Sequence, residues 1–369
     1  MYMKNVVNII KKLFLYTPPK PSYKFALPED STNKITSNSS SDLQPPNEIV
    51  TSLATNLTNL KVRYNALINS DIILREFNLS INGNFYKALI VCIDGMIDSE
   101  LVNNFLLRPL MSTNSNASKT FNYNGVVVKK SKKFNLENYI YNSLVPQNSI
   151  QKATTLDDLI NLVNMGNCAF LVDTLDVSFI VDVKGYKARE IASPENEVVV
   201  RGSQEAFVEK LRTNTSMLRR LINNENLIIE STTVGKVSNT NIAICYLKNI
   251  ANSELVDEVK YRINNLDIDY IVSSGQLEQL IQDNSKIAFP QMIATERSDK
   301  AATHILEGRV VVIVNGSPYA LIMPGVFLDF LSSPEDMNLK QQYSNLLKIL
   351  RILYTFITLL LPGIYIAVT

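Results

Sequence analysis

Charged side chains are the residues of this sequence that could carry a specific function, and they gather in two places. Three arginines share a stretch with helical spacing: Arg212, Arg219 and Arg220. A second group of mixed sign surrounds a later expected helix and consists of Glu296, Arg297, Asp299, Lys300, Glu307 and Arg309. A solvated helix face is the usual explanation for such groups. The alternative is an interface of ion pairs, between parts of the chain or between subunits, which the fixed donor geometry of arginine favours.

The motif "RGSQEAF" adds Arg201 to these candidates. Gly202 and Ser203 precede an expected helix there, and a helix N-terminus can bind an anion through its free N–H groups. An N-cap by the Ser203 hydroxyl explains the same residues more simply. The complete candidate interface cluster is Arg201, Arg212, Arg219, Arg220, Glu296, Arg297, Asp299, Glu307 and Arg309.

Catalytic chemistry has little support in the sequence. His304 is the only histidine, and in "KAATHILEGR" it fits an ordinary core or interface position. Asp157 and Asp158 open an expected helix, where carboxylates stabilise the helix dipole. The sequence contains no G-x-S-x-G turn, no phosphate-binding loop and no dinucleotide fingerprint. We therefore expect no enzyme, no catalytic or metal-binding residue and no cofactor.

Composition narrows the class of protein further. The 369 residues are 46% hydrophobic and 19% charged, and the net charge is +1. Nucleic-acid binding needs a concentrated basic face, so we expect no nucleic-acid partner. Cys92, Cys168 and Cys245 lie far apart without a CxxC spacing. We expect them to be buried, reduced thiols in a cytosolic compartment.

An internal repeat organises the chain. The segment "LIVCIDGMIDSELV", which ends at Val102, matches "AICYLKNIANSELV", which ends at Val256. Upstream, "LINSDIILRE" at Leu67 matches "LINNENLIIE" at Leu221. Both pairs are separated by the same number of residues, as a duplication requires.

Two further matches follow in the same order. "LENYI" at Leu136 matches "LEQLI" at Leu277, and "GNCAFLVDTLDVSFIV" at Gly166 matches "GRVVVIVNGSPYALIM" at Gly308. Their separation is shorter, because the first copy contains an extra polar stretch, "MSTNSNASKTFNYN". Four matches in one order indicate a duplicated unit.

Each copy shows the same order of expected elements. A first helix, Leu53 to Ile68 or Gln204 to Ile222, precedes two strands, a helix opened by an Asp or Asn cap, a further helix and a closing strand pair. Densely β-branched segments bounded by turn residues support the strands. We expect an α/β fold of two tandem, duplicated α/β subdomains with mixed sheets, at residues 47–192 and 193–332.

The N-terminal segments lie outside this repeat. Residues 1–16, "MYMKNVVNIIKKLFLY", predict a short basic amphipathic helix on a membrane surface, with a frayed terminal helix as the alternative. Residues 17–46 are rich in Pro, Ser and Asn and poor in apolar residues, which predicts a disordered linker.

The chain ends in its most apolar stretch. We expect a membrane-proximal helix at 333–351 and a first transmembrane helix at 352–369, whose uncharged run falls just short of a bilayer core in length. Basic residues on the entry side place the soluble part in the cytoplasm by the positive-inside tendency. The residues expected at the membrane entry are Pro334, Glu335, Asp336, Lys348, Arg351 and Pro362.

From about Leu171 onward the chain resembles the A subunits of bacterial spore germinant receptors, the GerA-type family. The most specific segment is "FPQMIATERSDKAATHILEGRVVVIVNGSP", and "SPEDMNLKQQYSNLLKILRILYTFITLLLPGIYIAVT" is similar to the family's entry into the membrane. The first copy is similar mainly in its order of elements. Met337 stands where family members often have Tyr. Family members continue through several more membrane helices, so the resemblance implies that the helix expected at 352–369 is truncated.

The resemblance implies a subunit of a nutrient receptor complex in the spore inner membrane, with its soluble part on the cytoplasmic side. Such A subunits work with a transporter-like B subunit and a lipoprotein C subunit, form homo-oligomers and pass the signal as ion release. The soluble part would then be an assembly and signalling module, and Arg297→Glu would impair assembly without unfolding it. Two alternatives remain: a small-molecule-binding module with its ligand between the two subdomains, and a membrane-anchored enzyme.

Overall fold

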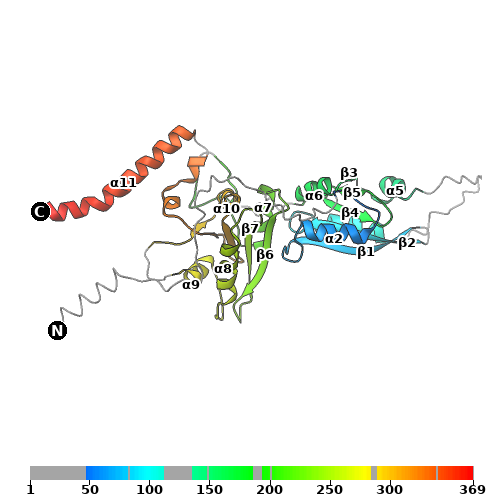
Figure 1. The fold of residues 1–369 in the computed structure, drawn as a ribbon, viewed down its shortest axis with the longest axis horizontal. Helices are drawn as coiled ribbons and strands as arrows, with labels where there is room; N and C mark the ends of the chain where they lie inside the picture. The colour runs from blue at the N-terminus through cyan, green and yellow to red at the C-terminus, as the bar shows by residue number, and fades with distance from the viewer. Residues whose placement is uncertain are drawn as a thin grey trace, which may run out of the picture. The chain divides into compact units, whose positions relative to one another are not determined.

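The computed structural model describes residues 47–81, 84–111, 135–147, 149–185, 193–199, 202–283, 289–337 and 340–368 (Figure 1). The expected amphipathic segment at 1–16, the expected linker at 17–46 and the candidate residue Arg201 lie outside the described residues.

The first copy of the repeat forms a five-stranded sheet with the strand order β1-β2-β4-β5-β3. Asp98 caps the helical segment after β2 by accepting hydrogen bonds from the next turn, as its residue type predicts. The elements of this copy are α2 (Leu53–Arg63), β1 (Ile72–Ile81), β2 (Asn84–Ile93), α3 (Ser99–Leu101), η1 (Val102–Leu107), α4 (Arg108–Met111), α5 (Leu136–Tyr139), η2 (Ile140–Leu144), β3 (Ile150–Ala153), α6 (Leu156–Asn164), β4 (Cys168–Val172) and β5 (Ser178–Val181).

The second copy repeats this topology, with the strand order β6-β7-β9-β10-β8. Each strand therefore has a counterpart at the same place in the other sheet, which confirms the predicted duplication. The elements of this copy are α7 (Leu211–Leu221), β6 (Leu227–Val234), β7 (Thr240–Leu247), α8 (Ser253–Asn264), α9 (Ser274–Ile281), β8 (Ile293–Thr295), α10 (Ser298–Leu306), β9 (Val310–Val314) and β10 (Ala320–Met323).

The α/β class is confirmed, but the expected mixture of parallel and antiparallel strands is wrong. Every pairing between described strands is antiparallel. The helices α6 and α10 do connect strands that run in the same direction, as in a βαβ unit. The hairpin strand β5 or β10 lies between the two connected strands, so the parallel strands are never neighbours.

Helices cover both faces of each sheet, and the central strands are apolar at consecutive positions for this reason. In β2, Leu89 and Val91 pack under α2 and α6, whereas Ile90 and Cys92 face η1 and η2. In the second copy α7 and α10 cover one face, and α8 and α9 cover the other. All three cysteines are free and buried, as predicted.

The first helix of each copy is shorter than expected. Helix α2 ends at Arg63 rather than at Ile68, and α7 begins at Leu211 rather than at Gln204. The loop between α2 and β1, residues 64–71, is consequently longer than its counterpart at 222–226. The sequence match between Leu67 and Leu221 is therefore not a structural equivalence, since one residue lies in this loop and the other ends α7.

The chain leaves the second sheet through two 3-10 turns, η4 (Phe327–Leu331) and η5 (Pro334–Met337), and ends in α11 (Gln341–Val368). Residues 341–351 of the expected membrane-proximal helix and the apolar run belong to this one helix, with Pro362 inside it, whereas residues 334–337 form η5. At about 1.5 Å per residue the helix is longer than a bilayer core of roughly 30 Å. By length and composition, α11 is the one candidate membrane span among the residues that the structure describes.

Candidate functional site

A buried ion pair joins the two copies of the repeat. The Arg219 guanidinium on α7 makes two hydrogen bonds of 2.8 Å to the carboxylate of Asp71, one from Nε and one from Nη2. Both side chains are at most 2% exposed. Two ions removed from water are stable together only when their geometry is good and their remaining donors and acceptors are satisfied. The bidentate arrangement provides this geometry.

The loop that carries Asp71 also attaches to the edge of the second sheet. The Ser70 N–H donates to the Ile229 carbonyl at 3.0 Å, and the Ile229 N–H donates to Asn69 Oδ1 at 3.0 Å. The same Asn69 oxygen accepts from Arg219 Nη2 at 2.9 Å. Ile229 lies in β6, the edge strand of its sheet. The loop therefore covers part of a strand edge that would otherwise expose unpaired backbone groups.

More exposed ion pairs surround this buried centre. Arg63 binds Glu225 with Nε at 3.0 Å and also contacts Asp157 at 2.7 Å. Arg212 contacts Asp94 at 2.9 Å, and both side chains are about two-fifths exposed. Exposed pairs of this kind contribute little free energy, so the Arg219 pair is the main electrostatic link.

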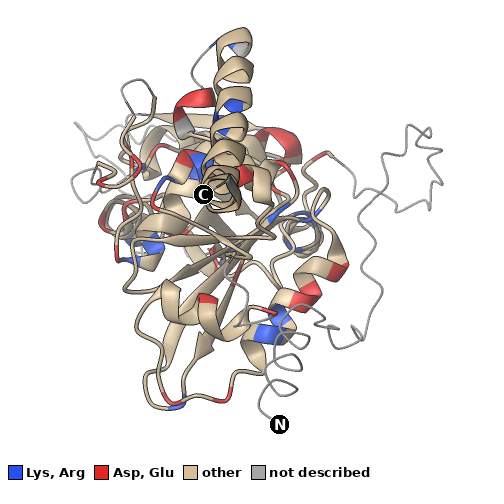
Figure 2. Cartoon of the chain, turned by 90° about the vertical axis from the view of Figure 1, so that its left-hand side faces the viewer, with Lys and Arg blue, Asp and Glu red and all other residues tan. Residues whose placement is uncertain are grey.

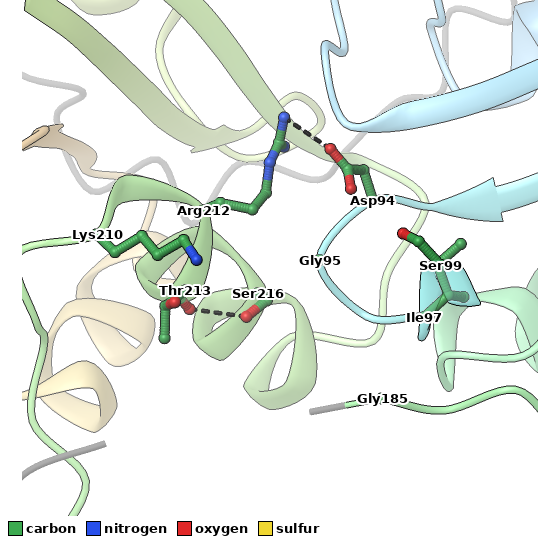
Figure 3. Close-up of a pocket in the computed structure, with 9 residues that line it drawn as sticks. All are labelled: Asp94, Gly95, Ile97, Ser99, Gly185, Lys210, Arg212, Thr213 and Ser216. Carbon is green, nitrogen blue, oxygen red and sulfur yellow. Dashed lines mark hydrogen bonds and ion pairs between the residues drawn. The ribbon is translucent and has the colours of Figure 1, made fainter. Parts of the chain in front are cut away.

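A pocket of about 240 Å³ lies beside the Arg212 pair, with walls from both copies (Figure 3). Gly95 lines it with a φ of 84°, and an added Cβ would lie 3.1 Å from the Arg212 side chain. Glycine is therefore needed here for both its backbone conformation and its small size. The full lining is Asp94, Gly95, Ile97, Ser99, Gly185, Lys210, Arg212, Thr213 and Ser216.

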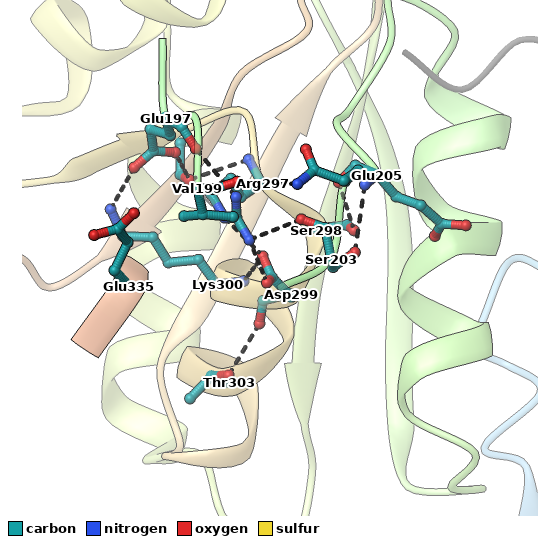
Figure 4. Close-up of polar contacts among 12 residues, drawn as sticks. Glu197, Val199, Ser203, Glu205, Arg297, Ser298, Asp299, Lys300, Thr303 and Glu335 are labelled. Carbon is teal, nitrogen blue, oxygen red and sulfur yellow. Dashed lines mark hydrogen bonds and ion pairs between the residues drawn. The ribbon is translucent and has the colours of Figure 1, made fainter. Parts of the chain in front are cut away.

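The second group of charges lies within the second copy (Figure 4). The Arg297 side chain is 1% exposed and binds Asp299 at 2.7 Å, and it donates to the carbonyls of Glu197 and Ser203 at 3.0 Å. Glu296 accepts from the N–H groups of Asn196 and Glu197 at 2.5 and 2.7 Å. These contacts hold the segment before α7 against the start of α10.

The burial of Arg297 overturns one expectation. A reversal to Glu would place a carboxylate beside Asp299 and two carbonyl oxygens in a site closed to water, so it would disrupt folding. It cannot serve as a mutation that leaves the soluble part folded and tests assembly alone.

A third set of charges fixes the segment that connects the second sheet to α11, which consists of η4 and η5. Arg309 binds Asp329 of η4 through Nη1 at 2.5 Å and Nη2 at 3.2 Å. Arg351 of α11 binds Asp336 of η5 through Nη1 at 2.5 Å and Nη2 at 3.0 Å. Burial alone would raise the pKa of each aspartate, but hydrogen bonds from the arginine and from a backbone N–H lower the pKa below its ordinary value.

The predicted cluster therefore divides into three structural groups. Arg212 and Arg219 join the two copies. Glu296, Arg297 and Asp299 make contacts within the second copy. Arg309 binds η4, the segment that follows the second sheet. The two remaining members that the structure describes also make local contacts: Arg220 binds Glu205, and Glu307 binds His304. Of the residues expected at the membrane entry, Pro334, Glu335 and Asp336 lie in η5, and Lys348, Arg351 and Pro362 lie in α11.

The sequence analysis missed the acceptors of Arg219. Asp71 and Asn69 occupy the loop that is longer in the first copy, and this extra length is the signal that could have identified them. Charges of both signs are interspersed over the described elements (Figure 2). Within that part of the chain no group of three or more His, Cys, Asp or Glu residues could hold a metal ion. The arrangement is suited to holding parts of the protein together.

These features define a class of protein in which a duplicated α/β module is clamped to an apolar helix long enough to cross a membrane. Residues 58–369 match the family described as "Bacillus/Clostridium GerA spore germination protein". The chain belongs to this family.

Individual relatives agree with this assignment. The chain is 34% identical over 318 residues to spore germination protein KA of Bacillus subtilis, a match that covers 86% of this chain and 55% of that protein. It is 32% identical over 320 residues to spore germination protein B1 of the same species, covering 87% and 62%. The chain thus spans about three-fifths of the length of these relatives.

A solved structure shows the same fold. The crystal structure of the N-terminal domain of the A subunit of the Bacillus megaterium spore germinant receptor GerK3 matches with a TM-score of 0.53 and 29% identity. The match covers 76% of this chain and 97% of that domain. The sequence-based recognition of the receptor A-subunit family and of its α/β fold is therefore confirmed.

We predict that Asp71→Ala will destabilise the protein far more than Asp94→Ala. The first substitution leaves the Arg219 charge buried and unpaired, which costs about 3–5 kcal/mol. The second removes an exposed partner of Arg212 and costs about 1 kcal/mol or less. Thermal unfolding of the detergent-solubilised chain, followed by circular dichroism, measures both. Equal shifts in Tm would contradict the assignment of Arg219–Asp71 as the main link.

We predict a pH-dependent effect of Asp336→Asn. Because the folded-state pKa of Asp336 is lowered, its ionisation stabilises the protein above the unfolded-state pKa of about 3.9, and this contribution is lost as the pH falls through the folded value. The variant should lose about 1–3 kcal/mol at neutral pH and approach the wild type below about pH 4. Unfolding across a pH series tests this. Asp267→Asn, at an exposed pair, should change little at any pH, and a loss for Asp336→Asn that persists at low pH would contradict the assignment.

Proposed function

We propose that this chain is the soluble module and first membrane helix of an A subunit in a nutrient germinant receptor, and that the module passes a signal that ends in ion release. The family match over residues 58–369 supports the receptor role. The named relatives are germination proteins and receptor subunits rather than enzymes, which supports a role without catalysis.

The observation that carries the signalling role is a series of arginine–aspartate clamps. Arg219–Asp71 links the first copy to the second, Arg309–Asp329 links the second sheet to η4, and Arg351–Asp336 links η5 to α11. In each clamp the arginine binds both carboxylate oxygens of the aspartate. Such a two-point contact resists rotation of one joined element relative to the other. A movement in either copy is therefore transferred to the membrane helix instead of being lost in a flexible joint.

The partners and location follow from the same proposal. The module works in a homo-oligomer with a transporter-like B subunit and a lipoprotein C subunit in the spore inner membrane. Lys348 and Arg351 precede the uncharged part of α11, which favours a cytoplasmic position for the module. The predicted interface charges that the structure describes are paired within the chain, so contacts with other subunits use other surfaces.

We predict that Arg351→Gln in the native-length gene slows nutrient-induced germination. Arg351 connects η5 with α11 and lies outside both sheets, so the module should remain folded while its connection to the helix is weakened. A coupling free energy of a few kcal/mol corresponds to roughly 5–150-fold, and we expect an effect in this range. The germination rate and the amount of receptor in spore membranes are measured together.

Lys348→Gln is the matched control. It removes the same charge from the same helix, where Lys348 is exposed, and leaves the Asp336 clamp intact. Its germination rate should remain close to that of the wild type. If Arg351→Gln germinates normally at a normal receptor level, the clamp does not transmit the signal.

The pocket in Figure 3 favours a second candidate function, the binding of a small polar molecule between the copies. Its volume of about 240 Å³ is below the usual range of ligand pockets and would suit only a small molecule, and its walls carry hydroxyl and charged groups. Thermal-shift measurements with amino acids, sugars and nucleosides test this. Stabilisation that is abolished by Ser99→Phe, which fills the pocket, would favour it over the purely mechanical role.

A further inference from the structure

An apolar surface patch surrounds η4. Val326, Phe327, Leu328 and Phe330 are each between 42% and 57% exposed, and Phe289 is 64% exposed. The rings of Phe289 and Phe327 contact each other edge to face, with centroids 5.9 Å apart. Single exposed apolar residues are common, but a contiguous group marks a surface that contacts something other than water.

The acidic residue of η4 is turned away from this patch. Asp329 is 17% exposed because Arg309 and the Val326 N–H bind its carboxylate. The outward positions of η4 are consequently Phe327, Leu328 and Phe330, which carry no charge. This separation of polar and apolar sides is typical of a segment that lies at a membrane surface.

A hydrogen bond fixes the position of η4 along α11. Arg351 Nη1 donates to the carbonyl of Leu331, the last residue of η4, at 3.3 Å. Arg351 is also the last charged residue of α11, and residues 352–368 are uncharged. The end of η4 therefore lies beside the helix at the level where its charge ends. In a membrane protein this level is the boundary between headgroups and hydrocarbon, where aromatic side chains are enriched.

We propose that the apolar face of η4, together with Phe289, inserts into the interfacial layer of the lipid bilayer beside α11. This inference rests on the proposed insertion of α11 in a membrane. The Phe rings enter the acyl-chain boundary, and the Arg309–Asp329 pair stays on the protein side. The module then contacts the membrane at a second place, and the lipid surface restricts the tilt of the module relative to the helix.

The absence of tryptophan from the sequence makes a site-specific test possible. The variant Phe327→Trp of the full chain carries a single tryptophan, which is excited selectively, and is reconstituted into phosphatidylcholine–phosphatidylglycerol vesicles. Two vesicle preparations are compared, with and without bromine on the acyl chains. We expect blue-shifted emission that is largely lost in the brominated vesicles, because bromine quenches only nearby indole rings. Circular dichroism establishes that the variant is folded.

Two further single-tryptophan variants calibrate the result. Leu360→Trp, in the uncharged part of α11, should be quenched, whereas Phe85→Trp, 76% exposed in the first copy, should not. If Leu360→Trp is quenched and Phe327→Trp is not, the inference fails while the membrane helix stands. Blue-shifted emission of Phe327→Trp without quenching would overturn it in favour of a protein partner. An unquenched Leu360→Trp would overturn both the inference and the membrane placement of α11.

Discussion

The arrangement of the two copies depends on the neutralisation of one buried guanidinium group. Arg219 is 2% exposed, and an unpaired charge at such a site would cost several kcal/mol. Asp71 provides the opposite charge from the other copy, and Asn69 takes one of the remaining N–H groups. Because these acceptors lie on the loop before β1, the loop, the edge of β6 and α7 must all adopt one relative position. The packing of the module is thus set by hydrogen-bond geometry as well as by apolar contact.

Duplication explains why this link is asymmetric. In each copy the first helix covers the equivalent face of that copy's own antiparallel sheet. An asparagine in that helix binds the backbone of the residue six positions earlier. Asn56 binds Val50 in the first copy, and Asn214 binds Val208 in the second. The added loop residues belong to the first copy alone, and the arginine that they bind belongs to the second. The two copies have therefore kept the same core and diverged where they meet.

The sequence predicted the duplication and most of the element order, because these depend on local patterns, but it missed the short strands β3 and β8 and one helix of each copy. Apolar runs, caps and repeated motifs are visible without knowledge of the fold. It could not predict which strands become neighbours, so the position of the expected hairpin strand, between β4 and β3 in the first sheet, was not foreseen. Nor could it separate buried from exposed charge: Arg219 and Arg212 lie on one helix, but only the first is desolvated. The partner of a buried charge is set by the tertiary structure, and Asp71 is 148 residues away.

The connection from the second sheet to α11 resembles the junction between the copies, because in both an arginine is paired with an aspartate of another element. A helix that enters a membrane must leave its last charge at the boundary, and Arg351 meets this requirement while binding Asp336 and the carbonyl of Leu331. One side chain thereby fixes both the depth of the helix and its attachment to the module. Since the same arginine carries both constraints, a rotation of the module cannot be absorbed at the membrane surface. It must either move α11 or break the clamp, and for the proposed function this requirement supplies a mechanical connection from the module to the membrane helix.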